Sequence, residues 1–202
     1  MKIIKQQDAN IDELSDVLKQ GNVIVYPTET CYGLGCDATN QEAVNKLFEI
    51  KKRRKDKAVL VLVSDLEMAE KYVELSSLVL KMVKKYWPGP LTIVAPSSGK
   101  GKLASGVIGS DNSVAVRMTD NQFASQLGAE LGKPLVSTSA NIADQESPYD
   151  IESVLSMYKD ANNKPDIVID AGVLPRRKPS TIVKVIGEDF EILRQGGLLL
   201  DI

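Results

Sequence analysis

Apolar positions near the start of the chain follow a helical spacing first and a strand-like run directly afterwards. One helical face is marked by residues that recur at intervals of three and four: Ile11, Leu14, Val17 and Leu18. This spacing predicts a helix over residues 11–20, with Asn10 as its N-cap and Gly21 at its end. The short apolar run 23–26 then predicts a buried strand.

The alternation of helices and strands continues to the end of the chain. Capping patterns and apolar spacing predict further helices over residues 39–54, from Ser64 onward, over 77–86 and over 119–132. Apolar runs predict further strands at residues 58–63, 91–95, 113–117, 134–136, 166–172, 180–186 and 190–196. This order is typical of an α/β fold, and the late strands without long crossovers favour a twisted open mixed sheet with flanking helices. No repeat or linker divides the sequence, so we expect residues 1–202 to form a single domain.

Polar side chains follow three of the predicted strands. Thr28 and Thr30 come just after the first strand, Arg117 ends a later one, and the segment 137–141, STSAN, begins where another ends. Ligands of open α/β sheets usually bind beyond the carboxyl ends of the strands, so the three segments together indicate a pocket. One such segment alone would more simply be a turn, whose Ser and Thr side chains bond to local backbone.

Charge is distributed unevenly along the chain. The net charge is −2, but residues 51–57 carry +5 and residues 176–178 carry +3, which leaves −10 for the remainder. A basic feature on an acidic body points to a localised anionic partner. Lys51 continues the apolar helix face, so we expect its stem to lie against the core and its ammonium at the rim. Lys52, Arg54 and Lys55 fit equally well as solvated charges at a helix C-terminus.

Composition excludes several chemistries. Without any histidine, the chain cannot use a Ser-His-Asp or Cys-His arrangement. Cys31 and Cys36 are the only cysteines, which implies neither a disulfide framework nor a zinc site and favours a cytoplasmic location. No run approaches the roughly 20 apolar residues of a membrane span, and the N-terminus lacks the apolar centre of a signal peptide. Gly33 and Gly35 do not belong to a GxxxxGK[ST] phosphate loop.

Seven segments occur in the order found in one enzyme family. They are PTETCYGLG (27–35), IKKR (50–53), WPGPLT (87–92), VAVR (114–117), PLVSTSAN (134–141), PSTI (179–182) and LRQG (193–196). Together they resemble the YrdC/TsaC-type threonylcarbamoyl-AMP synthases in their short, single-domain form, over roughly residues 10–197. The resemblance implies an α/β fold with a large basic concave cavity. It also implies a reaction that joins L-threonine, bicarbonate and ATP, supplied with Mg²⁺, into L-threonylcarbamoyl-AMP and releases diphosphate.

The resemblance also implies roles for individual residues. Thr28, Arg117 and Ser180 would bind threonine, with Arg117 holding its carboxylate. Lys51 and Arg53 would meet the ATP phosphates as the catalytic cations. Ser137, Ser139, Asn141 and Arg194 would complete the ATP site. The product would pass to proteins that transfer the threonylcarbamoyl group to tRNA, the first step of the threonylcarbamoyladenosine modification, and tRNA itself is a further possible contact. Neither the metal ligands nor the group that deprotonates threonine can be assigned from the residues.

Two other classes of function remain open at this point. An RNA-binding module acting in tRNA or ribosome maturation, without catalysis, would account for the basic run but not for the hydroxyl-rich strand ends. Aromatic residues make up only 5% of the chain, so a platform for stacking bases is not indicated. An α/β enzyme acting on sugar phosphates would need acidic metal ligands that converge on the pocket, and the sequence contains no such cluster.

Overall fold

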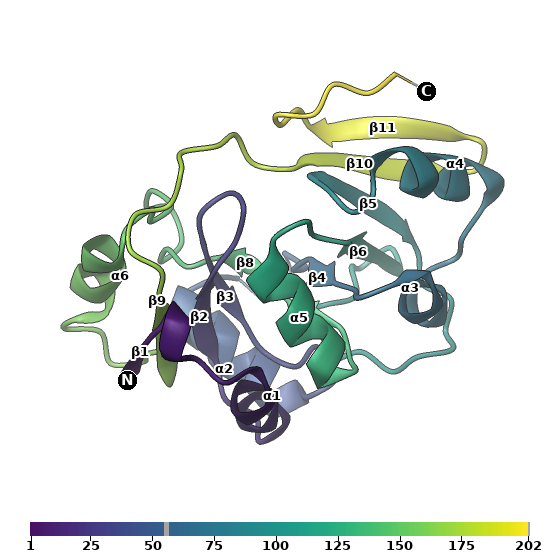
Figure 1. Cartoon of the computed structure of the whole chain (residues 1–202). Coiled ribbons are helices and arrows are strands. Elements are labelled where there is room, and N and C mark those ends of the chain that lie inside the picture. Colours follow the sequence, from purple (N-terminus) through teal and green to yellow (C-terminus); the bar gives the residue numbers. More distant parts are fainter. Residues whose placement is uncertain (55–56, 202) are drawn as a thin grey trace.

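In the described residues of the computed structural model, which are 1–54 and 57–201, the strands form two mixed sheets (Figure 1). The first sheet has the order β1 (Lys2–Lys5), β9 (Ile167–Asp170), β2 (Ile24–Pro27), β3 (Tyr32–Gly35) and β8 (Thr138–Ser139). The second has the order β11 (Asp189–Arg194), β10 (Thr181–Ile186), β5 (Leu91–Pro96), β6 (Ser113–Arg117), β4 (Val61–Leu62) and β7 (Leu135–Val136). The expected α/β class is confirmed, but the strands divide between two sheets instead of forming one. Lys55 and Asp56 of the basic run lie outside the described residues.

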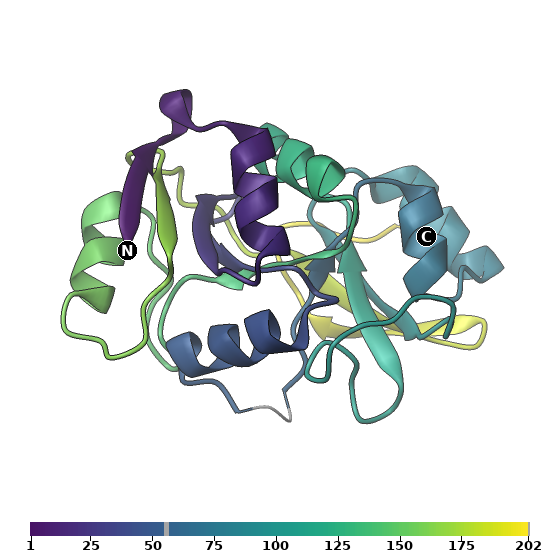
Figure 2. The ribbon, with the colours of Figure 1, turned by 90° about the horizontal axis from the view of Figure 1, so that it is seen from below.

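Helices cover both faces of the first sheet (Figure 2). Along β2, alternate side chains point to opposite faces. Ile24 and Tyr26 pack with α1 (Ile11–Lys19) and α5 (Gln122–Leu131), whereas Val25 packs in the cluster that includes the buried face of α2 (Gln41–Lys51). Because β2 is buried on both faces, apolar side chains are favoured at every position, which explains the continuous apolar run 23–26.

The remaining helices are α3 (Leu66–Tyr72), α4 (Ser77–Tyr86), α6 (Ile151–Tyr158) and the 3₁₀ turn η1 (Gln6–Asp8). In Figure 1, α3 and α4 lie beside the second sheet and α6 lies at the outer side of the first. Within the ranges 1–54 and 57–201, none of these helices has the length and apolar character needed to cross a membrane.

The helix caps differ from the sequence expectation at three sites. Asn10 caps α1 as predicted. The helices α2, α3 and α5 are capped by Asn40, Asp65 and Asn121, which lie one or two residues after the predicted starts of these helices. The hydroxyl of Thr39 donates to Asp37, at 2.6 Å, and the N–H groups of Glu42 and Ala43 donate to Asn40. The helix α2 also ends earlier than expected, at Lys51, because Lys52 adopts the left-handed conformation with φ of 51°.

The strand β3 is formed by residues that the sequence suggested were part of a loop. Gly35 faces a space too small for a side chain, since a Cβ there would lie 2.4 Å from the carbonyl oxygen of Val136 and 2.7 Å from the ring of Tyr26. The strand predicted over residues 58–63 is shorter than expected, since only Val61 and Leu62 form β4. The strands β1 and β8 and the helix α6 were not predicted.

The two sheets adjoin where the chain passes from β7 to β8. The N–H of Val136, in the second sheet, donates to the carbonyl of Cys36 at 2.9 Å, just beyond β3 of the first. Two residues later, Thr138 and Ser139 pair with Leu34 and Gly33 of β3. The segment STSAN is therefore the crossing between the sheets, which places its hydroxyl groups at the junction.

Candidate active site between the two sheets

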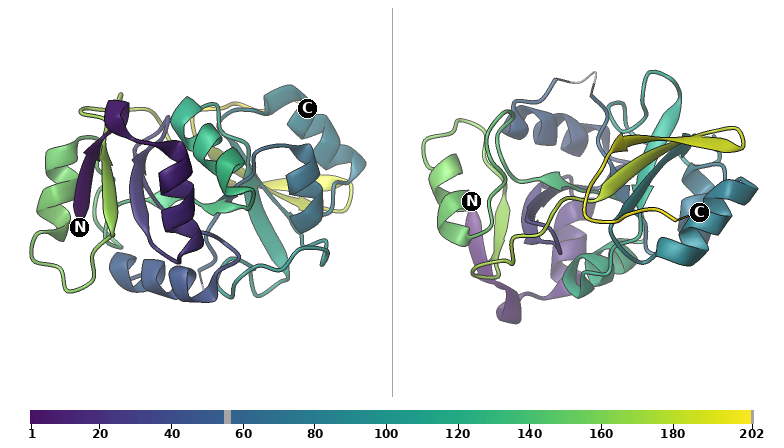
Figure 3. Two further views of the ribbon diagram at one scale, coloured as in Figure 1. Left: turned by 60° about the horizontal axis from the view of Figure 1, so that its bottom comes forward. Right: turned by 90° about the horizontal axis from the view of Figure 1, so that it is seen from above.

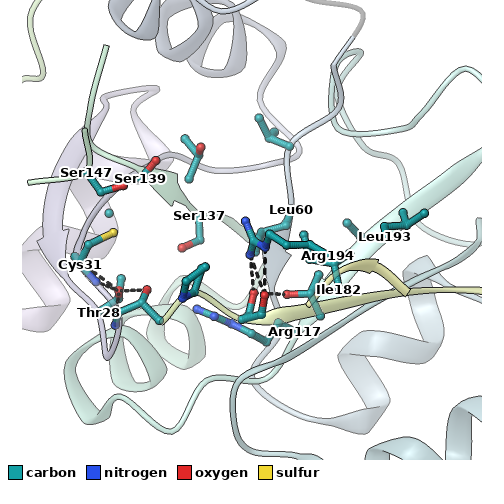
Figure 4. A pocket seen from close by; sticks show the side chains of 18 of the residues that line it. Thr28, Cys31, Leu60, Arg117, Ser137, Ser139, Ser147, Ile182, Leu193 and Arg194 are labelled. Atoms are coloured by element: carbon teal, nitrogen blue, oxygen red, sulfur yellow. Dashed lines mark hydrogen bonds between the residues drawn. The ribbon is translucent and has the colours of Figure 1, made fainter. Parts of the chain in front are cut away.

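A cavity of about 450 Å³ opens between the sheets, and residues from both of them line it (Figure 4). This volume lies in the range of small-molecule sites. Figure 4 shows Thr28 and Cys31 on one side and Arg194 on the other, with Ser137 and Arg117 between them. Of the residues predicted from the sequence, the cavity brings together Thr28, Arg53, Arg117, Ser137, Ser139, Ser180 and Arg194. Lys51 and Asn141 do not line it, but both contact Ser139 directly behind its wall.

The loop after β2 is held by the hydroxyl of Thr28. That hydroxyl donates to the carbonyl of Cys31 at 2.6 Å and accepts from the N–H groups of Thr30 and Cys31, both at 3.2 Å. The side chain of Thr28 therefore stabilises a local turn, as a Thr at a strand end commonly does, and also faces the cavity. Thr30 and Cys31 complete this wall. Burial raises the pKa of the Cys31 thiol, which keeps it neutral.

Arg117, at the end of β6, forms a buried ion pair with Glu29. The Nη1 of Arg117 lies 2.9 Å from Oε1 of Glu29, and only 4% and 8% of the two side chains are exposed. The hydroxyl of Thr119 donates to the second carboxylate oxygen at 2.8 Å. The Nε of Arg117 is buried and has no hydrogen-bond partner among the described residues, and the side chain also forms part of the cavity lining. Sequence reasoning missed Glu29, although its place in PTET beside two cavity threonines was a signal.

Lys51 reaches the back of the STSAN segment from the last turn of α2. Its Nζ donates to the carbonyls of Ser139, at 2.6 Å, and Asn141, at 2.9 Å, and to Oδ1 of Asn141 at 3.2 Å. Ser139 also donates its hydroxyl to that Oδ1. Burial, with the nearby charge of Arg53, lowers the pKa of Lys51 to about 8. The ammonium thus fixes the turn that presents Ser139, and it lies at the edge of the core as the helix pattern predicts.

Two further arginines are held in place by backbone carbonyls. Arg53 donates to the carbonyls of Lys57 and Ala58, at 3.0 and 2.9 Å. Arg194, at the end of β11, donates from Nε and Nη2 to the carbonyl of Ser180, at 3.0 and 2.9 Å, and from Nη2 to the Ser180 hydroxyl at 3.0 Å. Burial lowers the pKa of both guanidinium groups, and for Arg194 the charge of Arg117 adds to this effect. Each side chain is therefore oriented before any ligand arrives.

The lining combines arginines with hydroxyl groups. Arg53, Arg117, Arg177 and Arg194 contribute to it, and among the described residues it contains no Asp or Glu. No group of three His, Cys, Asp or Glu side chains is placed to hold a metal ion in residues 1–54 and 57–201. Such a set of donors suits an anionic ligand better than a resident cation. Arg177 and Tyr149, which also line the cavity, were not singled out from the sequence as site residues.

Comparison with known proteins finds relatives over nearly the whole chain. The model of the Sua5/YciO/YrdC family, described as "Telomere recombination", matches residues 16–196. A threonylcarbamoyl-AMP synthase of Vibrio vulnificus strain YJ016 is 35% identical over 191 residues, which cover 93% of this chain and 99% of the relative. The threonylcarbamoyl-AMP synthase of Psychromonas ingrahamii is 37% identical over 183 residues, covering 89% of this chain and 93% of the relative.

Solved structures share the fold. Sua5 of P. abyssi in complex with L-threonine superimposes with a TM-score of 0.87 at 29% identity, covering 98% of this chain and 57% of that one. The chain therefore spans little more than half the length of Sua5. The structure of E. coli YciO, at 22% identity, has a TM-score of 0.82 with 97% and 95% of the two chains covered, and it establishes the fold alone.

Proposed function

Because the chain belongs to the Sua5/YciO/YrdC family, we propose that it is an L-threonylcarbamoyl-AMP synthase, a nucleotidyltransferase that converts L-threonine, bicarbonate and ATP into L-threonylcarbamoyl-AMP and diphosphate. The observation that carries this proposal is a cavity lined both by hydroxyl groups of the β2–β3 loop and the STSAN segment and by Arg117 and Arg194, which end two strands of the second sheet. Such a cavity offers a small amino acid and a nucleotide their polar partners side by side.

The threonine half of the site lies between the β2–β3 loop and β6. Arg117 would bind the carboxylate of threonine with the part of its side chain that lines the cavity, while its Nη1 stays paired with Glu29. Thr28 and Ser180 would border the rest of the amino acid. Since Glu29 pairs with the guanidinium and is itself held by Thr119, threonine would meet a cation whose orientation is already fixed.

The nucleotide half uses the fixed cations and the STSAN turn. The nitrogen of threonine attacks the carbon of bicarbonate, water leaves, and an oxygen of the resulting carbamate attacks the α-phosphorus as the bond to diphosphate breaks. Negative charge grows on the phosphate oxygens, so Arg53 and Arg194 would stabilise the transition state, with Ser137 and Ser139 orienting the nucleotide and Asn141 holding Ser139 from behind. Lys51 would act through Ser139 and Asn141. A direct bond from its ammonium to phosphate, which the resemblance implies, requires Nζ to exchange one of its present acceptors.

Mg²⁺ belongs to the substrate in this scheme. The described lining offers hydroxyl oxygens but no carboxylate, so the protein would not hold the ion by itself. Mg²⁺ commonly remains on phosphate oxygens and water, and it would enter with ATP in that form.

The proposal includes the use that the cell would make of the product. The product would be used in the cytoplasm by proteins that transfer the threonylcarbamoyl group to tRNA, which gives the chain a role in tRNA processing. An RNA-binding module without catalysis is not favoured, because the cavity lining contains only one aromatic residue among those described, Tyr149, and so offers little surface for stacking bases.

The test is diphosphate release from ATP and bicarbonate by the purified protein, with each amino acid supplied in turn. We expect release with threonine alone, accompanied by a product of the mass of threonylcarbamoyl-AMP. Release that is the same with every amino acid, or without any, would reject the proposed substrate.

A further inference from the structure

The segment that leads from one sheet to the other, residues 171–180, which we call the strap, contributes Arg177, Pro179 and Ser180 to the cavity lining (Figures 1 and 3). It leads from β9 of the first sheet to β10 of the second. At its start the N–H of Ala171 donates to the hydroxyl of Tyr32 at 2.9 Å, and that hydroxyl donates to the carbonyl of Gly172 at 2.8 Å. At its end Ser180 accepts hydrogen bonds from Arg194. The strap is therefore tied at both ends, and its exposed middle lies between these anchors.

Three consecutive cations occupy the exposed part of the strap, but their surroundings differ. The guanidinium of Arg176 lies 5.1 Å from the centre of the Tyr149 ring, in a cation–π contact. The backbone of the strap is fixed to the same residue, since Leu174 donates its N–H to the Tyr149 carbonyl at 2.6 Å. Arg177 instead lines the cavity, whereas Arg176 does not. Arg176 is therefore engaged with Tyr149, whereas Arg177 is placed to contact a ligand in the cavity.

The hydrogen-bond partners of the four cavity arginines single out Arg177. Arg53 and Arg194 are bonded to backbone carbonyls, and Arg117 is paired with Glu29. Arg177 has no hydrogen-bond, ion-pair or ring partner in the described part of the chain. A guanidinium carries five N–H donors in a fork that matches the oxygens of phosphate, and all of them remain open here.

We propose that Arg177 binds the polyphosphate chain of the nucleotide, and that it does so from the strap once ATP has entered the cavity. This inference rests on the proposed function, which supplies ATP as the ligand. The threonine carboxylate is a less suitable partner, because buried Arg117 already provides a cation for it. Arg177 would thus be a third cation on the phosphates, beside Arg53 and Arg194. Unlike those two, it is not held by backbone carbonyls before the ligand binds.

The experiment compares Arg177→Ala with Arg176→Ala, a neighbour of equal charge on the same strap. Calorimetry would measure the binding of three probes to each full-length variant: Mg²⁺-ATP, inorganic diphosphate with Mg²⁺, and adenosine. For Arg177→Ala we expect the affinity for ATP and diphosphate to fall by about tenfold, as is usual when a charge-assisted hydrogen bond is lost. Adenosine should bind unchanged. Arg176→Ala should leave the affinity for all three probes nearly unaltered.

Three outcomes would overturn the inference. Equal losses in both variants would mean that the strap acts only through its overall charge. An equal loss for adenosine would mean that the substitution disturbs the cavity itself, and no loss at all would remove Arg177 from the site. The proposed function is tested separately, by the release of diphosphate from ATP in the presence of threonine. A wild-type protein that binds diphosphate through Arg177 but releases no diphosphate with threonine would contradict the synthase activity and leave the Arg177 contact intact. Failure of the wild type to bind any polyphosphate would contradict both.

Discussion

Several side chains of the cavity are held in place by contacts with other residues. Glu29 holds Arg117, Ser180 holds Arg194, and Lys51 holds the turn around Ser139. Each of these contacts joins residues far apart in the sequence, or uses a backbone carbonyl, so none follows from the local pattern. Part of the cavity wall, such as Thr28, Arg117 and Ser139, could be predicted from strand ends and from the family resemblance. Arg177 and Tyr149 were not singled out, and Glu29 could not be identified as the partner of Arg117.

The buried pair of Glu29 and Arg117 should contribute to stability as well as to binding. Removing one member of a buried ion pair leaves the other charge uncompensated, so we expect Glu29→Gln to lower the free energy of unfolding by about 3 kcal/mol. Urea unfolding measures this directly. Glu70, whose carboxylate lies 3.1 Å from Lys100 with both side chains about 60% exposed, is the matched surface pair. Glu70→Gln should change the free energy of unfolding by less than about 1 kcal/mol, and equal effects at the two sites would contradict the argument.

Lys51 should make ATP binding depend on pH in the range where it titrates. Its pKa is lowered to about 8, and bound phosphate favours its charged form. The free energy that its charge adds to binding is therefore present below this pKa and is lost as the pH rises above it. We expect the affinity for Mg²⁺-ATP, measured without threonine, to weaken about tenfold as the pH rises from about 7 to about 9.5. In Lys51→Met this step should be absent, and a wild-type affinity that stays constant would exclude the role given to Lys51.

At the scale of elements, the glycines of β3 matter because they let two strands and a ring approach closely. An added Cβ at Gly35 would lie 2.4 Å from the Val136 carbonyl oxygen, which belongs to the strand leading into STSAN. We expect Gly35→Ala to reduce the free energy of unfolding by about 2 kcal/mol, the usual cost of overpacking a core. Its control is Gly128 in α5, where nothing lies within 4 Å of an added Cβ.

Gly128→Ala should have the opposite sign. In a helix interior, alanine is favoured over glycine by roughly 1 kcal/mol, and here the methyl group has room. Thermal unfolding of the two variants beside the wild type would measure both effects. A Gly35→Ala protein as stable as the wild type would show that the close approach of β3 to β7 can relax without cost.

The elements that the sequence predicted are those with a local signature. The helix α1 has four apolar residues at helical spacing and a capping Asn10, and it was predicted almost to the residue. The strand β3 was missed because Gly33 and Gly35 are typical of loops, and because its pairing with β8 joins segments that are far apart in the sequence. The two-residue strands β4 and β7 lie within the predicted apolar runs 58–63 and 134–136, whereas β8 has no apolar residues to indicate a strand.

At the scale of the whole molecule, the sheets are joined by the STSAN crossing and by the strap, and the cavity lies between these two connections. The division into two sheets could not be predicted, since it is decided by pairings such as β1 with β9 and β4 with β7, which are far apart in the chain. The location of the site beyond the ends of β2 and β6 could be predicted, because strand direction alone fixes it.

The central claim is that this one cavity holds threonine and ATP together, and a crystal structure with L-threonine and a non-hydrolysable ATP analogue tests it most directly. We expect the threonine carboxylate within hydrogen-bonding distance of Arg117, and the phosphates between Arg53, Arg194 and the STSAN turn, with Arg177 on the polyphosphate. Either ligand bound outside the cavity, or threonine and nucleotide excluding each other, would contradict it.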